Sequence, residues 1–145
     1  MFEQHLQQLC AKLAQADIDI AIITDDDSVY YYSGYYDYLH MEFGRPTLLI
    51  VTRAGDSLLI TPAIDESMAR AHARVDRVAA WNDGLGKEWR EQIPAMLQGV
   101  GRVAIEMQRM PVIVRSYIDS LVTPGQLLDL TPMVAAMRMI KSEPE

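Results

Sequence analysis

The sequence has little cysteine: Cys10 is the only one among 145 residues. A single thiol excludes an internal disulfide and a cluster of cysteine metal ligands. Cys10 lies between Leu9 and Leu13 in a helical apolar pattern, so we interpret it as a small apolar residue of a buried helix face. The absence of disulfides is consistent with a reducing cytoplasm.

Basic charge is also scarce, with 13 Lys and Arg against 20 Asp and Glu and a net charge of −7. This balance argues against general nucleic-acid binding and against docking on anionic lipid, because both need a basic surface. The chain contains no run of the roughly 18–20 apolar residues that a membrane span requires. It begins with no basic segment followed by an apolar run, as a signal peptide would. We therefore expect a soluble, cytoplasmic protein that binds neither nucleic acid nor membrane.

Motifs of catalysis and cofactor binding are missing as well. The first apolar strand, 18–24, leads into "DDDS" rather than into a glycine-rich phosphate loop, and no serine lies on a G-x-S-x-G turn. The three histidines have no metal-binding spacing, and we expect His5 and His72 on the surface or on helix flanks. The acidic turn Asp25–Asp27 is either a helix cap or a Mg²⁺ site of the receiver or phosphatase kind. We therefore predict no catalytic residue, cofactor site or metal site within these residues, apart from that alternative.

Hydrophobic residues make up 50% of the chain, and its length suits one packed domain. The order of apolar patterns predicts an α/β fold: a single three-layer domain with a mixed, mostly parallel sheet that includes one hairpin, and helices on both faces. The predicted strands are 18–24, 46–52, 57–62, 75–81, 102–106 and 126–131. The predicted helices are 2–16, about 27–34, 62–74, 85–98, 111–121 and 132–140.

Local signals set the boundaries of several predicted helices. Gly34 is expected to end the second helix, and Thr61 and Pro62 to cap and open the third. Pro94 falls inside the fourth helix and should kink or shorten it. Thr131 is expected to cap the last helix. The side chains expected to face inward are Ile64, Met68 and Ala71 on the third helix, and Met133, Val134, Met137 and Ile140 on the last.

One segment is unusual in composition: "YYYSGYYDYLHMEFGRP", 30–46, contains six of the seven tyrosines. Tyrosine is enriched at interfaces because it buries a large area and keeps a polar tip. The guanidinium of Arg45 could bind a carboxylate through a forked contact. Two interpretations stay open. The segment is a binding loop, or it is an aromatic cluster packed on its own domain with Arg45 in a surface ion pair.

The last residues, Ser142–Glu145, have the pattern of a helix start. Serine followed three residues later by glutamate is a capping box, and Pro144 suits a first helical turn. A cap serves the N–H groups of the helix that follows it. We therefore expect a further domain to begin at 142.

Three stretches together resemble one family, the creatinase/prolidase-type proteins. "DIDIAIIT" resembles the opening of their N-terminal domain, and "YYYSGYYDYLHMEFGRPTLLIVT" resembles a Tyr-Tyr-Ser run followed by Phe-Gly-Arg and a strand. "LLDLTPMVAAMRMIKSEPE" resembles the junction between their two domains. The resemblance spans about residues 5 to 145.

The resemblance implies a ribonuclease H-like N-terminal domain over 1–141, with 142–145 as the start of a C-terminal catalytic domain of the pita-bread fold. That second domain would be the same-chain partner, and in metal-dependent members it holds the metal ligands, here expected as a dinuclear Mn, Co or Zn site. The family also implies a homodimer. By the resemblance, Phe43 and Arg45 contact substrate, with Arg45 taking its carboxylate. His40 and Tyr38 lie in a loop longer than that of creatinase and would alter the pocket.

Two functions follow from the resemblance. The first is a non-catalytic domain of a Xaa-Pro peptidase or of a C–N hydrolase of small carboxylate substrates, contributing to dimerisation and substrate gating. The alternative is a protein-interaction module of a relative that has lost catalysis.

Overall fold

A six-stranded mixed sheet forms the centre of the computed structural model, which describes residues 1–36, 45–84, 88–141 and 143. The strand order is β4-β3-β2-β1-β5-β6. Strand β2 is antiparallel to both neighbours, and the other three pairs are parallel. The strands are β1 (Ile20–Ile23), β2 (Leu48–Thr52), β3 (Ser57–Pro62), β4 (Arg77–Trp81), β5 (Val103–Ile105) and β6 (Leu127–Asp129).

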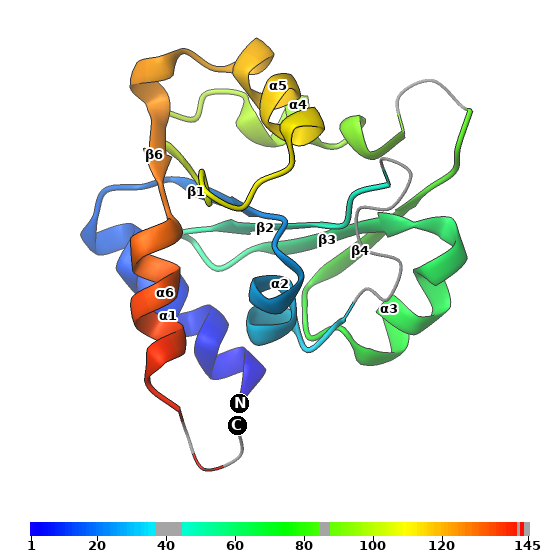
Figure 1. The fold of residues 1–145 in the computed structure, drawn as a ribbon, viewed down its shortest axis with the longest axis horizontal. Helices are drawn as coiled ribbons and strands as arrows, with labels where there is room; N and C mark the ends of the chain where they lie inside the picture. The colour runs from blue at the N-terminus through cyan, green and yellow to red at the C-terminus, as the bar shows by residue number, and fades with distance from the viewer. Residues whose placement is uncertain (37–44, 85–87, 142, 144–145) are drawn as a thin grey trace.

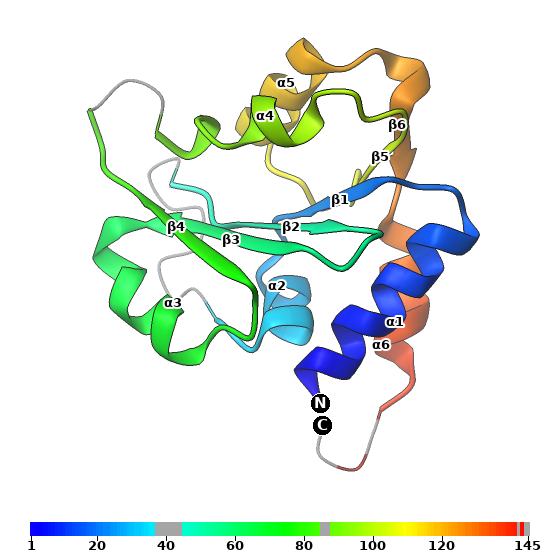
Figure 2. The ribbon, with the colours of Figure 1, turned by 180° about the vertical axis from the view of Figure 1, so that it is seen from behind.

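Helices cover both faces of this sheet, so the predicted three layers and the β2–β3 hairpin are confirmed. Figure 1 shows α1, α2, α3 and α6 on one face and α4 and α5 on the other, and Figure 2 shows the same arrangement from behind. The helices are α1 (Phe2–Gln15), α2 (Asp26–Ser33), α3 (Glu66–His72), α4 (Ile93–Leu97), α5 (Val112–Leu121) and α6 (Thr131–Met139). Short 3-10 turns are η2 (Ala63–Asp65), η3 (Glu88–Arg90) and η4 (Pro124–Gln126). Among the described residues, no helix is long and apolar enough to cross a membrane.

Strand β1 is buried on both faces of the sheet. Ile20 and Ile22 pack into the core beneath α4 and α5, and Ala21 and Ile23 pack into the core formed with α1, α2, α3 and α6. Full burial of one isoleucine stabilises a fold by roughly 1.5–3 kcal/mol. A strand covered on both sides needs an uninterrupted apolar sequence, which is why "IAII" shows no alternation.

Helix α1 buries Leu9 and Leu13, and Cys10 is half-buried beside them, as expected. Its Sγ lies 3.5 Å from the carbonyl oxygen of Thr52, and burial raises the pKa of the Cys10 thiol. The prediction of a surface or flanking His5 is wrong, because this residue is only 7% exposed. Its ring stacks on Tyr31 at 3.9 Å between centroids, and its Nδ1 donates to the Tyr31 carbonyl oxygen at 2.9 Å. His72 is exposed, as predicted.

The predicted start of the third helix is wrong. Thr61 and Pro62 are the last residues of β3, where they pair with Ala80 and Trp81 of β4. The pairing extends the strand past a sequence that locally favours a helix cap. The buried side also differs from the prediction: Ala69 is buried, whereas the three residues expected inward face solvent, with Ile64 69% and Met68 48% exposed and Ala71 exposed too.

The predicted helix 85–98 is also shorter than expected. Its described part consists of η3 and of α4, which begins at Ile93, and residues 85–87 lie outside the described residues. Pro94 occupies the first turn of α4, where a missing N–H leaves no hydrogen bond unmade. Trp89, Ile93 and Leu97 fill the core on this face.

The predicted cap of α6 is wrong: Thr131 is the first residue of the helix, and the N-cap position is Leu130, which makes no side-chain cap hydrogen bond. The side chain of Asp129 accepts hydrogen bonds from the N–H and hydroxyl of Thr131, at 2.9 and 2.6 Å. Val134 and Met137 face inward as predicted, and Met133 packs at the core edge. Ile140 lies beyond the helix end and is 80% exposed, so its predicted inward position is wrong.

Gly34 ends α2 as predicted, and its replacement should destabilise the fold. Its φ is +77°, and a Cβ there would lie 2.9 Å from the ring of Phe2. Gly34→Ala combines left-handed backbone strain of about 1 kcal/mol with a displaced aromatic ring. Gly99→Ala is the matched control, because φ is +72° and nothing lies within 4 Å.

Urea denaturation should show a larger loss of unfolding free energy for Gly34→Ala than for Gly99→Ala. Equal losses would contradict the contact between α1 and the end of α2.

Candidate functional site at the carboxyl ends of the parallel strands

The chain leaves β1 and β5 toward opposite faces of the sheet. After β1 it enters α2 on one face, and after β5 it continues to α5 on the other (Figure 1). In α/β proteins such a divergence opens a crevice outside the carboxyl ends of neighbouring parallel strands, where ligands commonly bind. Asp25 stands at this edge after β1, and Glu106 directly after β5.

Asp25 organises the crevice. As the N-cap of α2, its Oδ2 accepts from the N–H of Ser28 at 3.2 Å. Arg109 Nη1 lies 3.2 Å from Oδ1, and Arg138 Nη1 lies 3.3 Å from Oδ2. The carboxylate thus joins α2, the segment after β5 and α6 through hydrogen bonds and ion pairs.

Glu106 is buried beneath these groups and is only 1% exposed. Its Oε2 lies 3.0 Å from Ser28 Oγ, and its Oε1 has no hydrogen-bond partner among the described residues. Burial raises the pKa of Glu106 to about 7; the hydrogen bond from Ser28 opposes this rise and the nearby charge of Asp25 adds to it. Arg109 and Arg138 act more weakly to lower that pKa.

The Ser28 hydroxyl faces two carboxyl groups with one hydrogen. Its Oγ lies 3.1 Å from Asp25 Oδ2 and 3.0 Å from Glu106 Oε2, and it accepts from Arg138 Nη1 at 3.1 Å. Both carboxyl contacts are hydrogen bonds only when one carboxyl carries a proton. Glu106 is the group whose burial favours the neutral form. In its neutral state Glu106 donates to Ser28, and Ser28 donates to Asp25.

Asp25 therefore confirms the helix-cap interpretation of the acidic turn. The alternative Mg²⁺ site is not supported: two arginines contact Asp25, and Arg138 Nη2 also lies 3.4 Å from Asp27. Within the described ranges, no group of three His, Cys, Asp or Glu residues could hold a metal ion.

Arg45 is the one predicted site residue that the structure describes. It lies shortly before β2, and its Nη2 forms an ion pair with Asp83, which follows β4; both side chains are partly exposed. Arg45 is thus in the surface ion pair that one of the two interpretations anticipated. Tyr38, His40 and Phe43 lie outside the described residues, so their predicted role stays a prediction.

Much of the described tyrosine segment packs on its own domain. Tyr31, Tyr32 and Tyr35 are buried, and the hydroxyls of Tyr31 and Tyr32 donate to the carbonyl oxygen and the Sδ of Met137, at 3.1 and 3.3 Å. Burial raises the pKa of Tyr32. Tyr30 is exposed instead. These residues support the packed-cluster interpretation for 30–35.

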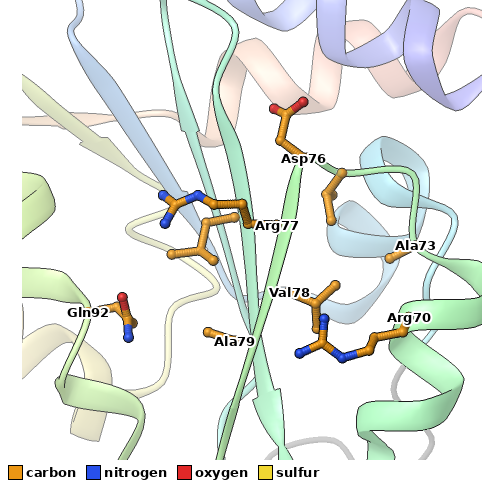
Figure 3. Close-up of a pocket in the computed structure, with 9 residues that line it drawn as sticks. Arg70, Ala73, Asp76, Arg77, Val78, Ala79 and Gln92 are labelled. Carbon is orange, nitrogen blue, oxygen red and sulfur yellow. The ribbon is translucent and has the colours of Figure 1, made fainter.

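A second hollow, of about 530 Å³, lies along β4 at the edge of the sheet (Figure 3). In Figure 3, Val78 points toward the side of the strand where Arg70 and Ala73 lie, and Ala79 points away from it. Two of its polar side chains have structural partners: Asp76 accepts from the N–H and hydroxyl of Ser57, both at 2.8 Å, and Arg70 pairs with Glu66. This hollow follows an open sheet edge and gathers no reactive groups.

By its architecture the protein is a three-layer α/β domain with a mixed six-stranded sheet. The model of the creatinase/prolidase N-terminal domain matches residues 5–140, and the chain belongs to this family. The structure is similar to that of a proline dipeptidase from Streptococcus pneumoniae TIGR4, with a TM-score of 0.80 and 25% identity over 94% of this chain and 98% of that chain.

Two further solved structures share the fold. The creatinase/prolidase N-terminal domain of an X-Pro dipeptidase from Streptococcus pyogenes has a TM-score of 0.78 at 23% identity, over 92% of this chain and 98% of that one. The prolidase from Pyrococcus horikoshii OT3 has a TM-score of 0.77 at 18% identity, and the match covers 98% of this chain but 37% of that chain.

The crevice residues Glu106, Arg109 and Arg138 were not predicted from the sequence. A glutamate after the short strand "RVAIE" resembles an ordinary polar strand end. The available signal was the position of two acidic residues. Glu106 directly follows a buried parallel strand, and Asp25 caps the helix that follows the first strand.

Replacement of Glu106 should change how stability depends on pH. The pKa of Glu106 is about 7 in the fold against an ordinary 4.5, so its contribution is fully present below 4.5 and is lost as pH rises to 7. That loss is about 3 kcal/mol at most. In chemical denaturation between pH 4.5 and 8, Glu106→Gln should lack this decline.

Glu91→Gln, on the exposed surface, is the matched control and should retain the wild-type slope. Parallel pH profiles for wild type and Glu106→Gln would contradict a proton held at Glu106.

Proposed function

We propose that this chain is the non-catalytic N-terminal domain of a Xaa-Pro peptidase or creatinase-like C–N hydrolase that acts on small carboxylate-bearing substrates. The observation that carries the proposal is the family match over residues 5–140. The similar structures support it, since they are those of a proline dipeptidase, an X-Pro dipeptidase and a prolidase.

The catalytic groups belong, in this proposal, to a C-terminal pita-bread domain of the same chain. The match to the P. horikoshii prolidase leaves 63% of that chain unmatched, as 100% minus the covered 37%, which is room for such a domain. The dinuclear Mn, Co or Zn site is assigned to that domain, because no group of potential ligands occurs in the part of the present chain that is described. When bound, the metal pair would activate a water molecule.

Arg45 is the residue of this domain that binds the carboxylate of the substrate. Its guanidinium orients the substrate carboxylate, and Asp83 holds the arginine in place before substrate arrives. A fork-shaped guanidinium can bind a carboxylate through two parallel N–H donors. Phe43 forms a wall of the pocket, and His40 and Tyr38 modify it. The pocket is completed across a homodimer, in which this domain reaches the catalytic domain of the other subunit.

Arg45→Ala in the full-length protein should lower kcat/KM selectively for substrates with a free carboxylate. A charged hydrogen bond of about 1.5–3 kcal/mol corresponds to roughly a 10–100-fold loss. We would compare a Xaa-Pro dipeptide with its C-terminal amide, whose hydrolysis should change little. The measurement is steady-state kinetics on both substrates.

Arg53→Ala is the control, because Arg53 is also a surface arginine paired with aspartates, Asp17 and Asp19. It should leave both substrates unaffected. Equal kcat/KM for wild type and Arg45→Ala on the dipeptide would remove Arg45 from the substrate site.

A protein-interaction module is the second candidate, and one surface favours it. Tyr30, Tyr36 and Met68 line a hollow of about 180 Å³ between α2 and α3, and Tyr30, Met68 and nearby Ile64 are exposed. Exposed apolar groups rimmed by charge suit a protein partner. The residues encoded after Glu145 discriminate: two Asp, one His and two Glu at the family's metal-ligand positions favour the peptidase, and their absence favours a metal-free relative or the module.

A further inference from the structure

We propose that the groove between α6 and the segment after β5 is a binding site for a small oxyanion, and that Glu106 takes up a proton when the anion binds. The site is separate from Arg45 and stands independently of the proposed peptidase function. It combines a cavity, three cationic side chains in its lining and a buried acid.

The groove has a volume of about 410 Å³, which is ample for an anion of a few heavy atoms. Its lining contains basic side chains although the chain has a net charge of −7. Three cationic side chains line it, two of them paired with Asp25 or Asp27 outside the lining, and among the described lining residues Glu106 is the sole acid. The polar lining residues are Glu106, Gln108, Arg109, Thr131, Arg138 and Lys141.

The cations retain hydrogen-bond donors for a ligand. Arg109 contacts Asp25 through Nη1 alone in the described structure, although a guanidinium has five N–H donors. Its side chain is 52% exposed and reaches solvent. Lys141 Nζ donates to the carbonyl oxygen of Arg138 at 2.6 Å, which leaves two of its three donors. Arginine and lysine donors that converge on one groove match the oxygens of a sulfate, phosphate or carboxylate.

Arg138 is the fixed part of the site. Its Nη1 contacts Asp25 and Ser28, and its Nη2 contacts Asp27, so the guanidinium cannot swing away without loss of these partners. This arginine forms one wall of the groove, and Arg109 and Lys141 line it with N–H donors that remain for an anion.

Glu106 couples the site to pH. Its Oε1 is buried and has no hydrogen-bond partner in the described part of the chain, so the ionised form carries a charge that burial disfavours. An anion in the groove adds negative charge near Glu106, beyond that of Asp25, and favours the protonated form further. By linkage, protonated Glu106 then binds the anion more tightly than ionised Glu106 does. The other charged or titratable groups around Glu106 are Asp25, Asp27 and Tyr32 of the α2 region, Arg109 after β5, Asp129 of β6, and Arg138 and Lys141 at the end of α6.

The test is a titration of the 145-residue chain with sodium sulfate, in which binding is monitored by the amide NMR chemical shifts. A titration with sodium chloride at equal ionic strength is the control. Sulfate is fully ionised in the neutral range, so any pH dependence belongs to the protein. We expect saturable shifts around Gln108, Thr131 and Lys141, with affinity at least about fivefold greater at pH 6 than at pH 8. A parallel titration with sodium acetate separates a tetrahedral anion from a carboxylate, and saturable binding of either supports the proposal.

Three variants make the result specific. The double variant Arg109→Gln and Lys141→Gln should lose saturable binding, whereas Arg53→Gln with Arg115→Gln removes the same charge outside the groove and should retain it. Glu106→Gln should still bind sulfate but with little difference between pH 6 and pH 8.

Three outcomes would overturn the proposal. They are binding of neither anion above the chloride control, equal loss in both double variants, and a pH dependence that persists in Glu106→Gln.

Discussion

The two directions in which the chain leaves β1 and β5 are the constraint on which the rest of this structure depends. Strand β1 is buried on both faces and is antiparallel to β2 and parallel to β5. Its exit into α2 and the opposite exit of β5 leave an edge that side chains must close. Asp25, Ser28 and Glu106 meet there, and Arg138 reaches them from α6, 110 residues after Ser28. Asp25, the N-cap of α2, is thus also a tertiary contact of α6 through Arg138.

This edge concentrates polar groups in an otherwise apolar interior. A buried carboxyl with one unpartnered oxygen disfavours its charged form, and the protein accommodates Glu106 by raising its pKa rather than by giving it a direct ion pair. An apolar residue at position 106 would avoid the free-energy cost of burying a carboxyl group. A buried acid with a raised pKa beside a specific cluster of charged groups is typical of sites with a function. The Arg45–Asp83 pair, by contrast, is partly exposed, and surface pairs of this kind stabilise a fold little.

Local patterns were enough to predict the element order, the hairpin, the Gly34 helix end and the apolar stripe of α1. They failed where tertiary pairing outweighed local preference. Thr61 and Pro62 have the composition of a helix start, but the ladder with β4 keeps them in β3. His5 is on a helix flank in sequence, yet the stacking partner Tyr31 comes from another helix. The crevice was missed for a related reason: the proximity of Asp25 and Glu106 depends on β1 and β5 being neighbours in the sheet, and local patterns do not give the strand order.

The hydrogen bonding in the crevice and the proposed anion binding both depend on the protonation state of Glu106. Direct observation of that state is therefore the most decisive measurement. Carbon-detected NMR of the Glu106 side-chain carboxyl, assigned by comparison with Glu106→Gln, would follow its titration from pH 4 to 9. The account predicts a midpoint pKa near 7. A midpoint close to the ordinary value of 4.5 would contradict it, because Ser28 would then face two charged carboxylates with a single hydrogen.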